Sequence, residues 1–109
     1  MCKDGLSEYS HWGTTTQDIM DSALSLQIRD ALAIIETDLN AVADLLAGLA
    51  EEYRDTPVAG RSHLQHALPV TFGYKAAVWL SGIERHRTRL GELKPRATLL
   101  QFSGAAGTL

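Results

Sequence analysis

This sequence has only one cysteine and a small net charge. Its one thiol, Cys2, cannot close a disulfide within the chain, which favours a reducing compartment such as the cytosol. Ten basic and thirteen acidic residues leave a net charge of −3, so neither nucleic acid nor an anionic membrane is indicated as a partner. No apolar run approaches the roughly 18 residues of a membrane helix, and the first residues lack the apolar core of a signal peptide. We therefore expect a cytoplasmic protein of one domain at most.

Proline and glycine are almost missing from residues 18–54, where Gly48 is the one exception. Apolar side chains recur there at spacings of three and four, which is the period of a helix. Thr15 followed by Asp18 resembles a capping box, and acids suit the first turn of a helix. The spacing predicts one helix over residues 18–54, roughly 50 Å long at about 1.5 Å per residue. Its apolar stripe contains Ile19, Ala23, Leu26, Ala31, Leu32, Ile35, Leu39, Val42, Leu45, Leu46 and Leu49.

Proline marks the boundaries of the next two segments. The residue before Pro57 is pushed out of the helical region, so residues 55–68 are predicted to form a loop. Pro69 suits the first turn of a second helix, which we expect over residues 69–93, where Lys94 and Pro95 stop it.

Residues 94–109 are rich in glycine and alanine toward their end, which is typical of a loop or of backbone close to a ligand. Together the elements predict an all-α fold, a long-helix bundle of two long helices followed by a C-terminal loop or short segment. Two apolar stripes cannot fully cover each other, so we expect a homo-oligomer, either tetramer-like or a dimer that exchanges helices.

Polar clusters lie at both ends of the chain. The first, residues 11–18, has His11, Thr15 and Thr16 at a helix N-terminus, where hydroxyls and free N–H groups suit an anion. Alternatively, the threonines only cap the helix. The third cluster, residues 101–108, has Ser103 as a candidate donor among small residues, and could equally be a flexible end.

The second cluster, residues 61–66, is the densest. Arg61 could hold a carboxylate as a fork, and His63 could act as a general acid or base near neutral pH. Ser62 and Gln65 could orient the ligand. The alternative is a hydrogen-bonded loop joined to the end of the bundle. Two histidines three residues apart, with no thiol or acid nearby, are a weak ligand set, so we expect no metal.

His11 and His63 lie on either side of the predicted long helix. The ends of a straight helix of that length are roughly 50 Å apart. His63 follows the helix by nine residues, which span at most about 30 Å. The two histidines therefore cannot meet within one chain, and a site that uses both must be assembled from different subunits.

These motifs, in this order, resemble those of the fumarase/aspartase superfamily of lyases. Residues 11–18 are similar to its first signature, His-x-Gly-x-Thr-Ser-x-Asp, and residues 60–65 to its second, Gly-Arg-Thr-His-x-Gln. Residues 68–75 and 101–109 are similar to the branch that contains adenylosuccinate lyase and 3-carboxy-cis,cis-muconate cycloisomerase.

That resemblance implies a mostly helical homotetramer, with each active site built from signatures of three subunits and with no cofactor. His63 would be the general acid of a β-elimination that yields a fumarate-like product. Bacterial cycloisomerases of this branch commonly have tryptophan at the matching position, so His63 favours conventional lyase chemistry. The groups that hold and orient a substrate carboxylate or phosphate would be His11, Thr15, Thr16, Ser62 and Gln65.

The family's third signature, a flexible Gly-Ser-Ser-x-Met-Pro-x-Lys loop with a serine base, is not found in these 109 residues. We therefore expect a single partial domain, a fragment that is inactive or nearly so by itself, because a positioned base contributes about 10²–10⁴ in rate. Two alternatives remain: a non-catalytic, self-associating helical module whose polar clusters are idle, and a regulator that co-assembles with a full-length homologue.

Overall fold

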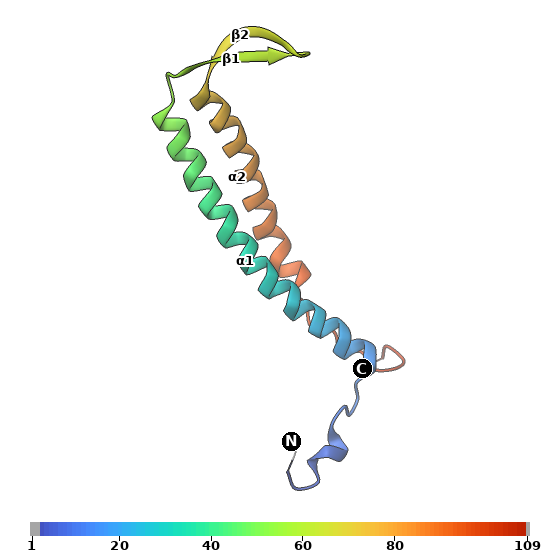
Figure 1. The fold of residues 1–109 in the computed structure, drawn as a ribbon. Coiled ribbons are helices and arrows are strands. Elements are labelled where there is room, and N and C mark those ends of the chain that lie inside the picture. The colour runs from blue at the N-terminus through green and yellow to red at the C-terminus, as the bar shows by residue number, and fades with distance from the viewer. Residues whose placement is uncertain (1–2, 109) are drawn as a thin grey trace.

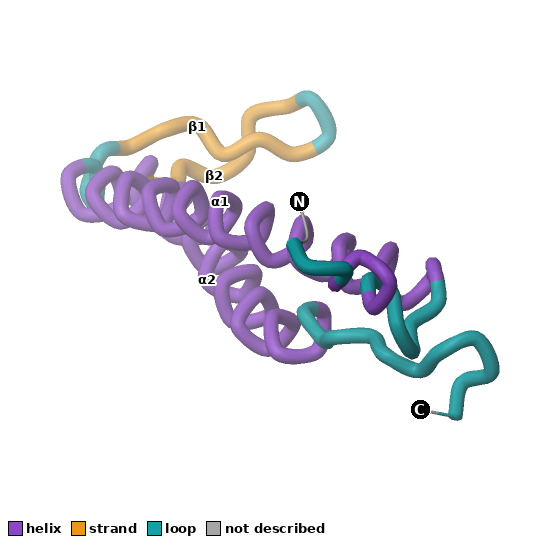
Figure 2. The backbone as a smooth tube through the Cα atoms, turned by 90° about the horizontal axis from the view of Figure 1, so that it is seen from below, coloured by secondary structure: helices purple, strands orange, loops and turns teal. Residues whose placement is uncertain are grey.

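Two long helices joined by a β-hairpin make up most of the chain (Figure 1). The computed structural model describes residues 3–108. The elements follow in the order η1 (Leu6–Tyr9, a 3-10 helix), α1 (Thr16–Glu52), β1 (Pro57–Ser62), β2 (Gln65–Thr71) and α2 (Phe72–Ala97). Helices α1 and α2 run side by side in opposite directions, and the hairpin extends beyond one end of the pair (Figures 1 and 2). The predicted pair of long helices is therefore confirmed.

Helix α1 starts two residues before the predicted position 18. Thr15 is its N-cap, and the Thr15 backbone N–H donates to the Asp18 carboxylate over 3.0 Å. This carboxylate accepts a backbone N–H that has no partner within the helix. The capping pattern therefore fixes where the helix begins. The 37 residues of α1 give a length of about 55 Å at about 1.5 Å per residue.

The predicted loop over residues 55–68 is wrong, because this segment forms most of an antiparallel hairpin. Val58 pairs with Val70 and Ala59 with Pro69, so Pro69 lies in a strand rather than in a helical turn. Each strand of a two-stranded sheet is an edge strand, where the missing N–H of a proline is tolerated. The mostly helical fold thus includes one small sheet.

Helix α2 begins at Phe72 rather than at Pro69, and it ends at Ala97 rather than before Lys94. At its start the Thr71 hydroxyl accepts the Tyr74 backbone N–H over 3.2 Å, which supplies an N-cap. Pro95 lies within the last turn. A proline in the last turn removes one helical hydrogen bond, and only Arg96 and Ala97 follow it in the helix.

The contact between α1 and α2 is tight at the hairpin end. A Cβ on Gly73 would lie 2.5 Å from the Ala50 carbonyl oxygen, so only glycine allows this approach. Tyr53 and Phe72 pack edge to face with ring centroids 5.5 Å apart. Farther along the pair, Lys94 of α2 forms an ion pair with Glu36 of α1.

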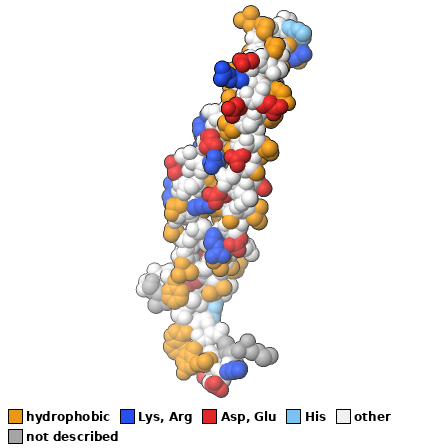
Figure 3. Space-filling view, turned by 90° about the vertical axis from the view of Figure 1, so that its left-hand side faces the viewer, with side chains coloured by type: hydrophobic (Ala, Val, Ile, Leu, Met, Phe, Trp, Pro, Cys, Tyr) orange, Lys and Arg blue, Asp and Glu red, His pale blue; other side chains and the backbone are white. Residues whose placement is uncertain are grey.

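Little of the apolar surface is buried. Among the described residues the buried hydrophobic side chains are Leu32, Ala43 and Ala76. The accessible surface is 8718 Å², against about 6,000 Å² for a compact monomer of this mass. The radius of gyration is 24.1 Å, against about 13 Å for a compact chain of this length. Apolar side chains are visible along the outside of the helices and at the N-terminal end (Figure 3). Within residues 3–108 no helix is long and apolar enough to cross a membrane.

Candidate functional site

The second polar cluster occupies the end of the hairpin. Arg61 and Ser62 end β1, Gln65 begins β2, and Ser62 pairs with Gln65 across the turn. His63 and Leu64 form this two-residue turn with φ of 48° and 65°, both left-handed. Asparagine and glycine are the usual residues in such a turn, so the backbone at His63 is held in a conformation that its residue type disfavours.

The side chains of the second cluster are exposed. Within residues 3–108, no side-chain hydrogen bond or ion pair joins Arg61, Ser62, His63 or Gln65 to another residue. A loop whose purpose is to fasten the hairpin to the bundle would use such bonds. The cluster instead presents its cation, hydroxyl, imidazole and amide to the outside.

A β-bulge separates the base of the hairpin from its end. The strand register shifts between Ala59 and Arg61, and Gly60 lies within the shift. A Cβ on Gly60 would lie 2.2 Å from the Leu68 carbonyl oxygen, so glycine is required at this position. Two residues of β2, Ala67 and Leu68, lie opposite Gly60, so the extra residue of the bulge belongs to β2.

The first cluster surrounds the start of α1, at the opposite end of the molecule. His11 has φ of 71°, and its carbonyl accepts the Thr14 hydroxyl over 3.2 Å. Thr15 is the N-cap, and Thr16 is the first exposed residue of α1. Trp12 is exposed, with its ring centroid 5.6 Å from that of Tyr9.

Asp18 joins the first and third clusters. Besides Thr15, its carboxylate accepts the backbone N–H of Ser103 over 3.2 Å, the Ser103 hydroxyl over 3.2 Å and the Gly104 N–H over 2.9 Å. A second link lies one turn along the helix, where the Ser22 hydroxyl bonds with both backbone groups of Gln101. The chain after α2 therefore returns to the start of α1, and the Ser103 hydroxyl is directed at Asp18.

The same hydrogen bonds set the charge of Asp18, which is 2% exposed. The Thr15 N–H lowers the pKa of this carboxyl, desolvation partly opposes it, and the donors of Gly104 and Ser103 lower it further. The sequence pattern identified Asp18 as a cap but not as the link to residues 101–108. Asp18 and Ser103 are 85 residues apart in the sequence. No local spacing therefore indicates that they are in contact.

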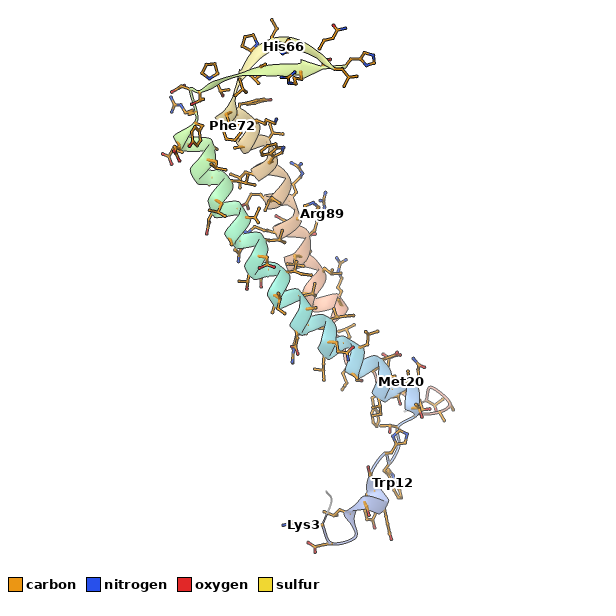
Figure 4. All side chains as sticks on the ribbon, in the orientation of Figure 1. Lys3, Trp12, Met20, His66, Phe72 and Arg89 are labelled. Atoms are coloured by element: carbon orange, nitrogen blue, oxygen red, sulfur yellow. The ribbon has the colours of Figure 1, made fainter. Side chains whose placement is uncertain are left out.

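The first and third clusters thus meet, whereas the second lies at the far end of α1. His66 in the hairpin and Trp12 in the first cluster mark the two ends (Figure 4). The longest dimension of the molecule is 75 Å. Across residues 3–108 there is no group of three or more His, Cys, Asp or Glu side chains placed to hold a metal ion.

Comparison with known proteins places the chain among lyases and related enzymes. Residues 3–109 match a family described as lyase. Trans-aconitate decarboxylase 1 from Mycosarcoma maydis is 50% identical over 108 residues, which are 99% of this chain and 22% of that protein. The 3-carboxy-cis,cis-muconate cycloisomerase of Pseudomonas aeruginosa is 57% identical over 101 residues, 93% of this chain and 22% of that protein.

A solved structure agrees with the fold. The crystal structure of fumarate lyase from Mesorhizobium sp. BNC1 matches with a TM-score of 0.93 and 61% identity, over 96% of this chain and 25% of that one. The chain therefore spans about a quarter of the length of the proteins it matches.

Proposed function

The chain belongs to the lyase family, as its motifs predicted, and on this basis we propose that it supplies two separate parts of a lyase or cycloisomerase active site. One part is the end of the hairpin with His63. The other is the start of α1 with His11, Thr15 and Thr16. The parts that meet in one site come from different subunits of a homo-oligomer in the cytoplasm.

The separation of the two clusters by α1 carries this proposal. A continuous helix of about 55 Å stands between them, and the hairpin leads away from the helix pair (Figure 1). The side chains of Arg61, Ser62, His63 and Gln65 have no hydrogen-bond or ion-pair partner within residues 3–108. A second subunit in antiparallel orientation would bring its own α1 N-terminus to them.

The proposed chemistry is addition or elimination by acid and base. A base takes the proton from the carbon beside a substrate carboxylate, the bond to the leaving group breaks as the double bond forms, and His63 donates a proton to the departing atom. An imidazole can hold and release this proton near neutral pH. The family resemblance assigns the base to a serine in a signature that these 109 residues do not contain.

The remaining cluster residues would bind the substrate. Arg61 is a fork for a carboxylate, and Ser62 and Gln65 flank the imidazole on the paired strand ends. On the other subunit, the N-terminus of α1 favours an anion. Ser103 would not bind the substrate directly. Its hydrogen bonds to Asp18 would hold the third cluster beside Thr15 and Thr16. The names of the two relatives contain trans-aconitate and a carboxymuconate, which supports a polycarboxylate substrate.

Self-association has separate support from the surface. The chain exposes about 2,700 Å² more than a compact monomer of its mass would. A standard interface buries about 800 Å² on each partner. The excess is therefore enough for more than one interface, which favours a tetramer-like assembly over a simple dimer.

Cross-linking between two cysteine variants tests the shared site. In a Cys2→Ser background, Leu64→Cys marks the hairpin end of one chain and Trp12→Cys marks the α1 start of another. We expect a thiol cross-linker of about 10 Å to join them only when the two variants are mixed. Within one chain α1 keeps these positions more than about 50 Å apart.

The matched control is Asp38→Cys, an exposed position near the middle of α1. It should not cross-link to Leu64→Cys, because half the helix length lies between it and the α1 start. A chain that remains monomeric by light scattering, or one that links Asp38→Cys as well as Trp12→Cys, would contradict the shared site.

The exposed apolar surface also favours a second candidate, a self-associating module without catalysis. Both candidates predict an oligomer, and they differ in their response to a dicarboxylate. A retained site binds fumarate and raises the unfolding temperature of the oligomer by mass action. An unfolding temperature that does not change across a fumarate titration would favour the module.

A further inference from the structure

A hollow between the hairpin and the first turn of α2 is lined by two cationic side chains, Arg61 and Lys75. The proposed function assigns a role to Arg61 but none to Lys75. The hollow has a volume of about 250 Å³, and it is lined by Val58, Ala59, Gly60, Arg61, Val70 and Lys75. Arg61 comes from β1, and Lys75 from the start of α2. No acidic side chain lines it.

The register shift of the hairpin lies beside this hollow. Between the paired positions on either side of the shift, β1 contributes only Gly60, whereas β2 contributes Ala67 and Leu68. The extra residue of the bulge therefore belongs to β2. Arg61 follows the shift on β1 and lines the hollow together with the paired Val58 and Val70.

Four of the other cations in residues 3–108 pair with acids: Arg29 with Asp30, Arg54 with Asp55, Arg87 with Glu84, and Lys94 with Glu36. The side chains of Arg61 and Lys75 form no ion pair or hydrogen bond within residues 3–108. The Lys75 ammonium lies 5.3 Å from the centre of the Trp79 ring. Such a contact positions a cation but leaves its three N–H donors free for an anion.

We propose that Arg61 and Lys75 form a subsite for an oxyanion with two negative charges, a dicarboxylate or a phosphate group. The guanidinium provides a two-pronged contact and the ammonium a point charge, which together balance two charges. The subsite deepens the proposed function, since it lies beside the hairpin end and adds Lys75 to the groups that would hold the substrate.

The test is a titration of the chain with fumarate and, separately, with inorganic phosphate at constant ionic strength. Backbone amide shifts in residues 58–61 and 70–75 are followed by NMR. We expect saturable shifts at these residues. Lys75→Gln and Arg61→Gln should each weaken binding by about tenfold or more, since a hydrogen bond to a charged group contributes at least about 1.5 kcal/mol. Lys75→Arg, which keeps the charge, should retain most of the binding.

Arg54→Gln is the matched control. Arg54 is at the same end of the molecule and pairs loosely with Asp55, but it does not line the hollow. Unchanged binding in this variant supports the subsite. Shifts that do not saturate, or an equal loss in Arg54→Gln, would overturn it. The titration needs neither assembly nor His63, so failed cross-linking and failed anion binding are separate results.

Discussion

The buried carboxylate of Asp18 has four donors from two distant segments, and no other described side chain joins α1 to residues 103–104. Its hydrogen bonds require the ionised form. The folded state therefore favours the carboxylate of Asp18, because a protonated carboxyl would accept fewer of these hydrogen bonds. Asp18 thus makes the largest share of the contact between the first and third clusters, and Ser22 adds a second link at Gln101.

Stability should fall in acid because of this residue. The folded pKa of Asp18 lies below its ordinary value of 3.8, so in acid the unfolded chain binds the proton first. The contribution is fully present above about pH 3.8 and is lost as the pH falls through the folded pKa. Urea unfolding between pH 6 and pH 3 measures it, and Asp18→Asn should remove this part of the pH dependence.

Asp21→Asn is the control for that measurement. Asp21 accepts the Gln17 side-chain amide within α1 and has no bond to residues 101–108. Asp21→Asn should lower the free energy of unfolding less than Asp18→Asn does. Amide protection at Ser103 and Gly104 should decrease only in Asp18→Asn. Equal loss of protection in both variants would show that Asp18 does not hold the third cluster.

The turn residue Leu64 offers a change in the opposite direction. Its φ is 65° and its side chain is fully exposed, so Leu64→Gly removes a left-handed penalty of roughly 1–2 kcal/mol without loss of packing in this chain. We expect slower amide exchange across the hairpin. Val70→Gly, in the regular part of β2 opposite Val58, should instead speed exchange. Faster exchange in Leu64→Gly would contradict the strained turn.

At the scale of elements, the helices were predictable and the hairpin was not. Helix α1 has the apolar period, the cap and almost no breakers, so its existence and length followed from local rules. The hairpin lacks the usual signal, because its turn is His63-Leu64 rather than Asn-Gly. Local rules favour Pro69 as a helix start, although an edge strand tolerates it equally well. The contact between Asp18 and Ser103 could not be predicted, because it depends on the antiparallel packing of α1 and α2. This packing brings the residues after α2 back to the start of α1.

Two glycines of α2 should respond oppositely to alanine. At Gly73 the new Cβ would meet the backbone of Ala50 and Arg54 at 2.5 Å, so Gly73→Ala should force α1 and α2 apart at a cost of about 1–3 kcal/mol. At Gly91 nothing lies within 4 Å, and Gly91→Ala should stabilise the helix by up to about 1 kcal/mol. Denaturant unfolding of the two variants measures both, and a neutral Gly73→Ala would contradict the close helix contact.

At the scale of the whole molecule, the thin core makes stability depend on assembly. Three buried hydrophobic side chains among residues 3–108 are too few to stabilise a helix pair of this length alone. We expect the unfolding temperature to rise with protein concentration, because a partner subunit binds only the folded chain. Calorimetry over a hundredfold dilution series measures this rise. A concentration-independent value together with a monomeric mass would contradict assembly.

The length of α1 has a genetic consequence. If each site draws its hairpin from one chain and its helix start from another, two alleles damaged at opposite ends of α1 would complement each other in a heterozygote. Two alleles damaged at the same end would not. The helix would thus divide mutations of one gene into two complementation groups, and its two ends would mark where the groups lie.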